Sequence, residues 1–504
     1  MEASELALAS AAEQAAAIAE GQISSEELVR AYLDRISAYN PKLNALVTMD
    51  AEAALAEARR RDRQLAAGGL AGPLHGLPIS VKDALTVAGM RSTGGIPRYA
   101  EHVPDRDAEA VARVRQAGAV ILGKTNMPTA NADFQSRNPV FGISNNPWDR
   151  SRTPGGSCGG GGAAVAAGLS SLELGSEIGG SLRIPAHFCG LYAHKSSFRT
   201  CPMTGHIPPG PESPGRDVSE FDLAVIGGIA RSSADLELLL QSLAGPPAEE
   251  ARAWSLVFPP PRATELEKFR IAAWFDDPFA PLDGEVGAVL DHFVDRLEAE
   301  GAEVDRAPAL PTGLRNLHEV YEALLFAAFG GDPNNSILSP QSAAYFLLHA
   351  ARHPRGQASR ARKYMEQKHK KWFDFDRHRF QLLAEWQPFF DSYDVLLMPI
   401  TGTVAPPHHN MDHNAWGRSI TVNGRRRDYF EQSAWNGVAN LLRTPATAVP
   451  AGRTKAGFPV GLQIMGPAYE DLTTLAFASC LEHRIGGFVP PSDYSLREPQ
   501  LAGS

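Results

Sequence analysis

A run of glycines interrupted by one serine is the feature that most restricts how this chain can fold. The run reads Gly155-Gly156-Ser157-Cys158-Gly159-Gly160-Gly161-Gly162. It has almost no side chains to hold other backbone at a distance, so it can turn tightly and pack closely. A second serine, Ser181, follows another glycine pair. A hydroxyl beside several unshielded backbone N–H groups is what a nucleophile and its oxyanion hole require.

A lysine stands at the end of a short apolar segment upstream of both serines. The segment reads Gly76-Leu77-Pro78-Ile79-Ser80-Val81-Lys82, and its apolar part is predicted to form a buried strand. Burial of an amine disfavours its charged form and lowers its pKa. A neutral Lys82 can then accept the proton that a serine must lose when it attacks a carbonyl.

These three segments resemble the amidase signature family of serine hydrolases. The resemblance covers roughly residues 20–470. Further segments that resemble the family, in the same order along the chain, are Ile23–Leu28, Asn40–Ala45, Gly123–Pro128, Tyr393–Pro399 and Gly457–Gln463. The family fold implies one large α/β domain, with a central mixed, twisted β-sheet covered by helices on both faces.

The resemblance also implies a Ser–cis-Ser–Lys triad. Ser181 matches the nucleophile, Ser157 matches the serine that follows a cis peptide and relays the proton, and Lys82 matches the base. The implied mechanism needs no metal and no cofactor. The oxyanion would be held by the backbone N–H groups of Ile178, Gly179, Gly180 and Ser181.

Three positions depart from the family pattern. Glu177 stands where the family usually has aspartate, and we expect it to pair with Arg183 and support the oxyanion loop. Cys158 and Gly161 replace two serines of the common Ser-Ser-Gly-Gly-Ser pattern. Ile184 occupies a position where glutamine-dependent amidotransferases commonly have glutamine, which disfavours that branch.

Other chemistry is possible for the glycine run. Residues 155–159 match the G-x-S-x-G nucleophile elbow, but that motif follows a strand, and residues 149–154 are polar and contain proline. Cys158 would need a partner base such as histidine, and none is near in sequence. The glycine run itself contains no G-x-x-x-x-G-K-[ST] phosphate loop.

Composition excludes several classes of protein. The chain has 504 residues, 43% of them hydrophobic, and a formal net charge of −9, so no general attraction to nucleic acid or anionic membranes is expected. Four cysteines in this length do not form a disulfide framework. Neither a signal peptide nor an apolar membrane span is recognised, so we expect a cytoplasmic protein. Residues 352–379 are basic and contain Tyr364, Trp372, Phe373 and Phe375, which we interpret as a solvated helix face with aromatics turned inward.

The single domain is expected to have four parts. Residues 1–68 are predicted to form N-terminal helices, including one that begins at Ser24 or Ser25. Residues 69–243 are expected to form the catalytic core, and residues 391–504 to return to the core sheet. Residues 244–390 are expected to be a variable helical insertion near the substrate entrance, without strands.

The sequence therefore predicts a serine amidohydrolase that acts on small apolar acyl or aryl amides, with esters and carbamates as further substrates. The alternative is a glutaminase or amidotransferase subunit that works with partner proteins. A homodimer is possible. Five residues are candidates for an apolar pocket wall: Phe134, Phe141, Ile178, Leu191 and Tyr192. A loop with His408, His409, His413 and Trp416 could border the site.

Overall fold

The computed structural model describes residues 3–208, 221–330, 340–352, 356–409 and 417–495. Its centre is an eleven-stranded sheet. In spatial order the strands are β1 (Leu46–Met49), β3 (Val120–Thr125), β2 (Pro78–Lys82), β6 (Glu173–Glu177), β8 (Val225–Ala230), β7 (Tyr192–Lys195), β14 (Ala446–Arg453), β15 (Pro459–Met465), β11 (Val395–Pro399), β9 (Ile271–Ala273) and β10 (Val304–Asp305).

The sheet mixes the two strand directions, as the sequence predicts. β2 runs parallel to both of its neighbours, β3 and β6, and β9 runs parallel to β10 and β11. The strands between these groups pair antiparallel. Two small hairpins lie outside the sheet: β4 (Arg137–Asn138) with β5 (Gly142–Ile143), and β12 (Ser419–Val422) with β13 (Arg425–Asp428).

Helices cover both faces of the middle strands. Successive residues of a strand point to opposite faces. On β8, a Cβ at Gly227 would meet Leu182, just before α7 (Arg183–Cys189), whereas a Cβ at Gly228 would meet Leu239 of α8 (Ser233–Leu243). α6 (Gly159–Ala166) packs against α7, and α15 (Asp471–Ile485) packs against α8. The predicted α/β fold class is therefore confirmed.

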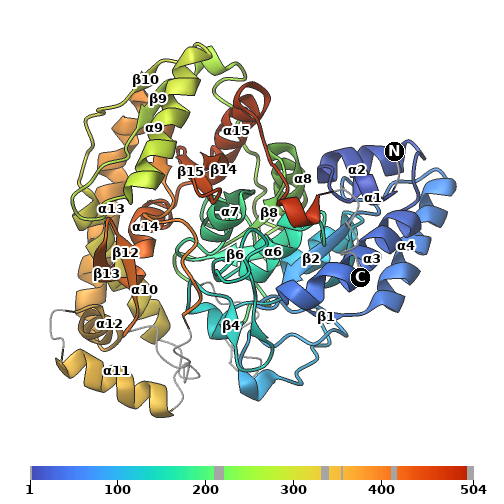
Figure 1. The fold of residues 1–504 in the computed structure, drawn as a ribbon, viewed down its shortest axis with the longest axis horizontal. Coiled ribbons are helices and arrows are strands. Elements are labelled where there is room, and N and C mark those ends of the chain that lie inside the picture. Colours follow the sequence, from blue (N-terminus) through green and yellow to red (C-terminus); the bar gives the residue numbers. More distant parts are fainter. Residues whose placement is uncertain (1–2, 209–220, 331–339, 353–355, 410–416, 496–504) are drawn as a thin grey trace, which may run out of the picture.

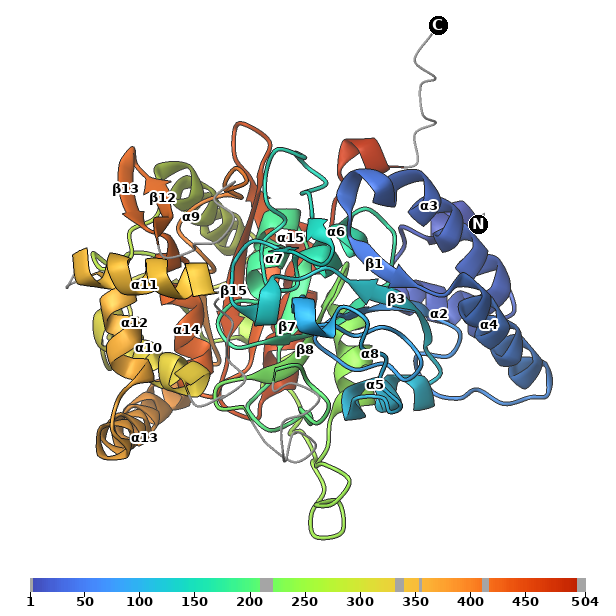
Figure 2. The same cartoon turned by 90° about the horizontal axis from the view of Figure 1, so that it is seen from below.

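The two ends of the sheet carry different groups of helices (Figures 1 and 2). At the β1 end lie α1 (Ala3–Leu6), α2 (Ala11–Ala19), α3 (Ser25–Leu43) and α4 (Ala51–Ala66). At the other end lie α10 (Leu314–Gly330), α11 (Pro340–Arg352), α12 (Gln357–Met365), α13 (His369–Ser392) and α14 (Ala434–Leu441). The other helices among the described residues are α5 (Glu109–Gln116), α9 (Gly284–Ala299) and short 3-10 turns at Pro97–Tyr99, Thr129–Asn131, Leu266–Lys268, Tyr429–Ser433 and Ser492–Tyr494.

The start of α3 follows directly from local sequence. Ser24 accepts a hydrogen bond from the backbone N–H of Glu27, and the Glu27 carboxylate accepts one from the backbone N–H of Ser24. This reciprocal pair satisfies two N–H groups that have no partner inside the helix. The helix predicted to begin at Ser24 or Ser25 begins at Ser25.

The prediction that residues 244–390 contain no strand is wrong. β9 and β10 both lie in this range, and β9 pairs with β11 inside the main sheet. β9 has three residues, too few to show a periodic pattern, and its pairing partner comes more than a hundred residues later in the chain. The other proposed boundaries between parts of the domain stay a prediction.

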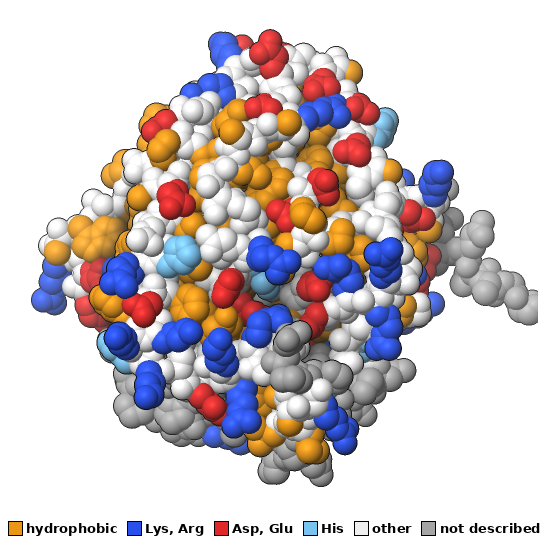
Figure 3. Space-filling view, turned by 90° about the vertical axis from the view of Figure 1, so that its left-hand side faces the viewer, with side chains coloured by type: hydrophobic (Ala, Val, Ile, Leu, Met, Phe, Trp, Pro, Cys, Tyr) orange, Lys and Arg blue, Asp and Glu red, His pale blue; other side chains and the backbone are white. Residues whose placement is uncertain are grey.

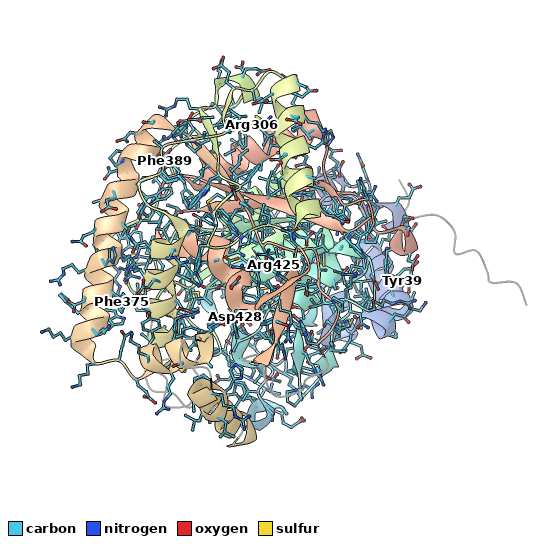
Figure 4. All side chains as sticks on the ribbon, turned by 60° about the vertical axis from the view of Figure 1, so that its left-hand side comes forward. Tyr39, Arg306, Phe375, Phe389, Arg425 and Asp428 are labelled. Carbon is cyan, nitrogen blue, oxygen red and sulfur yellow. The ribbon has the colours of Figure 1, made fainter. Side chains whose placement is uncertain are left out.

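The described part of the basic segment, residues 352 and 356–379, is mostly helical, and most of its aromatic side chains are turned inward. Tyr364 is buried and meets the ring of Phe375 edge-on at 5.6 Å, and Trp372 is partly buried. Phe373 differs from the expectation, because 53% of its surface is exposed. Figure 4 places Phe375 and Phe389 on the long helix α13. Figure 3 views the molecule from the left-hand side of Figure 1 and shows basic and acidic side chains interspersed on that face.

Among the described residues, no helix is both long enough and apolar enough to cross a membrane.

The glycine run lets α6 approach the sheet closely. A Cβ at Gly160 would lie 2.5 Å from the backbone N and O of Asn126, just beyond β3. A Cβ at Gly161 would overlap the carboxyl group of Glu173, on β6. Real carbon atoms do not approach this closely, so these glycines set the distance between α6 and the strands that carry the site.

We predict that Gly161→Ala destabilises the protein by about 1–3 kcal/mol, because the new methyl group overpacks against the buried Glu173 carboxyl. The free energy of unfolding in urea measures this. Gly287→Ala is the matched control, because Gly287 lies in α9 and a Cβ there meets nothing within 4 Å. That control should gain about 0.5–1 kcal/mol from helix propensity. Equal effects of the two substitutions would contradict the packing argument.

Candidate active site

The candidate site lies at one edge of the sheet, where two parallel strands end. Lys82 is the last residue of β2, and Glu177 is the last residue of β6. Because β2 and β6 are parallel neighbours, their carboxyl ends meet at the same edge. Ser181 follows β6 after a short loop, and Ser157 lies two residues before the start of α6. The fold therefore brings three distant parts of the sequence together.

A continuous chain of hydrogen bonds joins the three side chains. The Nζ atom of Lys82 lies 2.7 Å from Oγ of Ser157, and this Oγ lies 2.8 Å from Oγ of Ser181. The peptide bond between Gly156 and Ser157 is cis. All three side chains are buried or nearly so, with Ser181 the most exposed at 5%. The three residues are therefore in direct contact, in the order that a proton relay would need.

Burial lowers the pKa of Lys82 from its ordinary value. The acidic groups that face Lys82, namely the Cys158 thiol and the carboxyl groups of Glu173 and Glu177, oppose this shift but do not cancel it. Burial raises the pKa of Glu173 to about 7, so part of this carboxyl group is protonated near neutral pH. The protonated form carries no charge and does not oppose the lowering of the Lys82 pKa. The surroundings of Lys82 therefore shift its amine towards the neutral form.

An ion pair anchors the loop between β6 and α7. The Arg183 guanidinium binds one oxygen of Glu177, with Nε at 2.8 Å. The other oxygen of Glu177 accepts the backbone N–H groups of Leu182 at 2.9 Å and Arg183 at 3.2 Å. Burial alone would raise the pKa of Glu177, but the Arg183 guanidinium, the Leu182 N–H and the Lys195 amine together outweigh it and hold this pKa below its ordinary value. The loop is thus closed at its base by a fully buried charge pair.

The same loop is supported from above by Tyr321 of α10. Its hydroxyl donates to the carbonyl oxygen of Ile178 at 3.2 Å, and the backbone N–H of Ile184 donates to the carbonyl oxygen of Gly180 at 2.7 Å. In a trans peptide the C=O and the following N–H point in opposite directions. The N–H groups of Gly179 and Ser181 therefore point away from Tyr321 and α7. Among the described residues, no protein acceptor takes the N–H groups of residues 178–181.

A pocket opens beside Ser181. Its polar side is formed by the side chains of Lys82, Ser157 and Ser181 together with Asn131, Ser176, Glu177 and His206. The rest of the described lining is mostly apolar, and comprises Ala130, Ile178, Pro208, Phe221, Ala224 and Phe329. The rings of Phe221 and Phe329 lie 5.9 Å apart. The cavity therefore has one polar wall at the serines and an apolar remainder.

Of the five residues suggested for an apolar wall, Ile178 alone is among the described lining residues. Leu191 and Tyr192 are buried in the core. Phe134 packs against the rings of Tyr429 and Phe430, and Phe141 lies under the guanidinium of Arg91 at 5.0 Å. These four predictions are wrong for the described cavity, because sequence does not reveal which side of an element faces it.

The structure describes only part of the histidine-containing loop predicted to border the site. His408 and His409 are half-buried, and His408 contacts Asn145 at 3.0 Å rather than lining the cavity. His413 and Trp416 lie outside the described residues.

Sequence reasoning missed Asn131, His206, Phe221 and Phe329, which line the cavity, and Tyr321, which supports its loop. Asn131 carries a weak local signal, because asparagine tolerates positive φ, and the structure gives it a φ of 64°. The aromatic residues carry no such signal, because their positions depend on how α10 packs.

The rival chemistry of the glycine run does not fit the geometry. Burial raises the pKa of the Cys158 thiol to about 11, which opposes a thiolate nucleophile. Residues 149–154 form turns and irregular backbone with one isolated bridge, where a nucleophile elbow would require a strand.

Residues 27–475 match the family model for amidases. An indoleacetamide hydrolase from Bradyrhizobium diazoefficiens is 31% identical over 488 residues, which cover 95% of this chain and 86% of that protein. One subunit of a glutamyl-tRNA(Gln) amidotransferase, from Oleidesulfovibrio alaskensis, is 32% identical, and the match covers 94% of this chain and 96% of that protein. A crystal structure of an amidase has a TM-score of 0.75 and 28% identity, and covers 94% of this chain and 99% of that chain.

The match and the shared fold define an enzyme that hydrolyses amide bonds. The chain belongs to the amidase family. The resemblance seen in the glycine run and its flanking segments is confirmed across most of the chain.

We predict that Glu177→Gln destabilises the protein by about 3–5 kcal/mol, because it leaves the Arg183 guanidinium buried without its counter-charge. Urea denaturation at neutral pH measures this. Since folding lowers the pKa of Glu177, the stabilisation is complete above the ordinary carboxyl pKa and is lost as the pH falls through the folded-state value.

Glu26→Gln is the control for this prediction. Glu26 pairs with Arg30 and Arg59 at the surface, so its removal should leave the free energy of unfolding nearly unchanged. A loss at Glu177 no larger than that at Glu26 would show that the buried pair does not hold the loop.

Proposed function

We propose that the protein is a serine amidohydrolase in which Ser181 is the nucleophile, Ser157 the relay and Lys82 the base. Oγ of Ser181 bonds to the substrate carbonyl carbon while its proton passes to Ser157, whose own proton passes to Lys82. The C–N bond then breaks, and the departing nitrogen takes the proton back along the same path. Water attacks the acyl-enzyme in the second half-reaction and releases the acid.

The observation that carries this proposal is the unbroken contact from Lys82 through Ser157 to Ser181. It is supported by the burial that lowers the pKa of Lys82, because a neutral amine can accept a proton. The N–H groups of Gly179 and Ser181 point away from the hydrogen-bonded carbonyl groups of Ile178 and Gly180 in the same peptide units. We therefore propose these two N–H groups as the main donors to the oxyanion. Ile178 and Gly180 complete the set that the family resemblance implies.

The substrates we propose are small amides with an apolar acyl or aryl group. The described cavity walls around the serines are mainly apolar, with Phe221 and Phe329 side by side. Apart from His206, the ionisable groups among the described lining residues are Lys82 and Glu177, and both already have protein partners. An apolar group therefore gains burial in this cavity without leaving a charge unpaired.

Carbamates and esters present the same carbonyl to the same residues, so we include them in the proposal. A carbamate that loses its alkoxide leaves a carbamoyl-enzyme, which water converts into a carbamic acid. The carbamic acid then loses carbon dioxide and frees the amine. The cytoplasmic location and the homodimer stay predictions.

The test uses two matched substrates that both release p-nitroaniline: butyryl-4-nitroanilide and ethyl N-(4-nitrophenyl)carbamate. We expect turnover of at least one of them and no measurable turnover by Ser181→Ala. The ratio of the two rates separates amidase from carbamate-hydrolysing activity. Cys158→Ala is the control, and it should retain activity if the buried thiol takes no part in the chemistry. Full activity of Ser181→Ala would refute the proposed nucleophile.

The second candidate is a glutaminase that acts with partner proteins, because a component of a tRNA amidotransferase is among the similar proteins. The apolar lining of the described cavity favours it less, since glutamine carries both an ammonium and a carboxylate group. Ammonia release from glutamine, together with inactivity towards both p-nitroaniline substrates, would favour this candidate instead.

We predict that Tyr321→Phe lowers kcat about 10- to 100-fold. This loss is at or somewhat below the rate loss that follows removal of one oxyanion donor. The reason is that the phenol hydroxyl fixes the Ile178 peptide and with it the direction of the Gly179 N–H. Steady-state kinetics on the better p-nitroaniline substrate measures this. Tyr364→Phe is the control, because Tyr364 packs against Phe375 away from the cavity lining. A kcat unchanged in Tyr321→Phe would show that the loop does not need this support.

A further inference from the structure

The hydrogen-bond chain does not end at Lys82. Nζ of Lys82 also lies 3.1 Å from Oγ of Ser176 and 3.2 Å from the carbonyl oxygen of the same residue. Oγ of Ser176 lies 2.8 Å from Nε2 of His206, a residue that lines the cavity. Nδ1 of His206 lies 2.9 Å from the carbonyl oxygen of Pro208. The base is therefore connected through Ser176 to an imidazole and, beyond it, to a backbone carbonyl.

The far end of this chain fixes the direction of every hydrogen bond in it. A carbonyl oxygen only accepts, so Nδ1 of His206 must carry the hydrogen that bonds to Pro208. In a neutral imidazole the other nitrogen, Nε2, then has a lone pair and accepts. The hydroxyl of Ser176 must donate its one hydrogen to Nε2. Its oxygen is left to accept from Lys82.

The consequence for Lys82 follows from counting its hydrogens. A neutral lysine amine has two N–H bonds and one lone pair. The carbonyl oxygen of Ser176 accepts one N–H, and Oγ of Ser176 accepts the other. The Cys158 thiol, which also faces the amine, donates to the carbonyl oxygen of Ser176. The lone pair is left for the hydroxyl of Ser157, at 2.7 Å. This is the arrangement in which Ser157 can pass its proton to the amine.

We propose that His206 is a positioning residue that, through Ser176, directs the lone pair of Lys82 at Ser157. The inference rests on the proposed function, because it assigns a role to the base of that mechanism. His206 itself transfers no proton and forms no bond to substrate in this role. Its contribution is to take the Ser176 hydrogen that would otherwise be free to bond to the amine.

The electrostatics of the site are consistent with a neutral imidazole. Burial, reinforced by the nearby Lys82, lowers the pKa of His206 to about 4, despite the opposing hydrogen bond to Pro208. The imidazole therefore keeps its accepting Nε2 at neutral pH. The other titratable groups that face Lys82 are the Cys158 thiol and the carboxyl groups of Glu173 and Glu177, and none of these bonds to Oγ of Ser176.

A double-mutant cycle on Ser176 and His206 tests the proposal. The readout is the rate at which a fluorophosphonate labels Ser181, because this reaction needs an activated serine but no known substrate. Oγ of Ser181 bonds to phosphorus and fluoride leaves. Peptide mapping by mass spectrometry identifies the labelled serine, and turnover of butyryl-4-nitroanilide is measured alongside.

We expect His206→Phe to slow labelling about 10-fold in the wild-type background, and less than about 2-fold when Ser176 is already alanine. A residue that acts only by packing or by touching the ligand would cause the same loss in both backgrounds. His206→Gln can offer an amide oxygen to Ser176, so we expect it to restore part of the rate. Thermal unfolding of each variant checks that the comparison is between folded proteins.

The outcomes separate the two proposals. Equal losses in both backgrounds, or no loss in His206→Phe, would overturn the role of His206 while labelling at Ser181 still supports the nucleophile. Labelling at another residue, or none in the wild-type protein, would overturn the proposed function and with it this inference. Faster labelling in His206→Gln than in His206→Phe supports the role of a hydrogen-bond acceptor at this position.

Discussion

The buried guanidinium of Arg183 connects the segments that surround Ser181. It binds Glu177 at the end of β6, the side chain of Gln463 on β15, and both the carbonyl oxygen of Asn436 and the side chain of Asn440 on α14. A charge this deep in the protein is tolerable only when its donors are satisfied. The loop after β6 can therefore hold its shape only while the sheet and α14 keep their places, so the local geometry depends on the whole domain.

Much of the fold could be predicted because its signals are local. The capping box of Ser24 and Glu27 places the start of α3 within one residue, and the apolar run before Lys82 marks β2. β9 could not be predicted, since Ile271–Ala273 is too short to show a pattern and becomes a strand through its pairing with β11. Where the structure depends on a partner far along the chain, a single sequence carries no record of it.

The same division applies to the candidate site. Lys82, Ser157 and Ser181 stand in segments whose composition is unusual by itself, and the structure places them in contact. His206 and Tyr321 stand in ordinary surroundings, and each becomes notable through one hydrogen bond formed on folding. Local sequence thus indicated the residues that we propose for the chemistry, whereas the groups that orient them emerge only from tertiary structure.

Helix α10 contributes two different things to the site. Phe329, near its end, forms part of the cavity wall, and Tyr321, two turns earlier, holds the peptide of Ile178. A change in how this helix packs therefore alters the shape offered to a substrate and the orientation of the loop at once. In evolutionary terms, the two traits are inherited as one segment. A lineage that exchanges α10 to accept a new substrate must also preserve, or rebuild, the contact that holds the loop between β6 and α7.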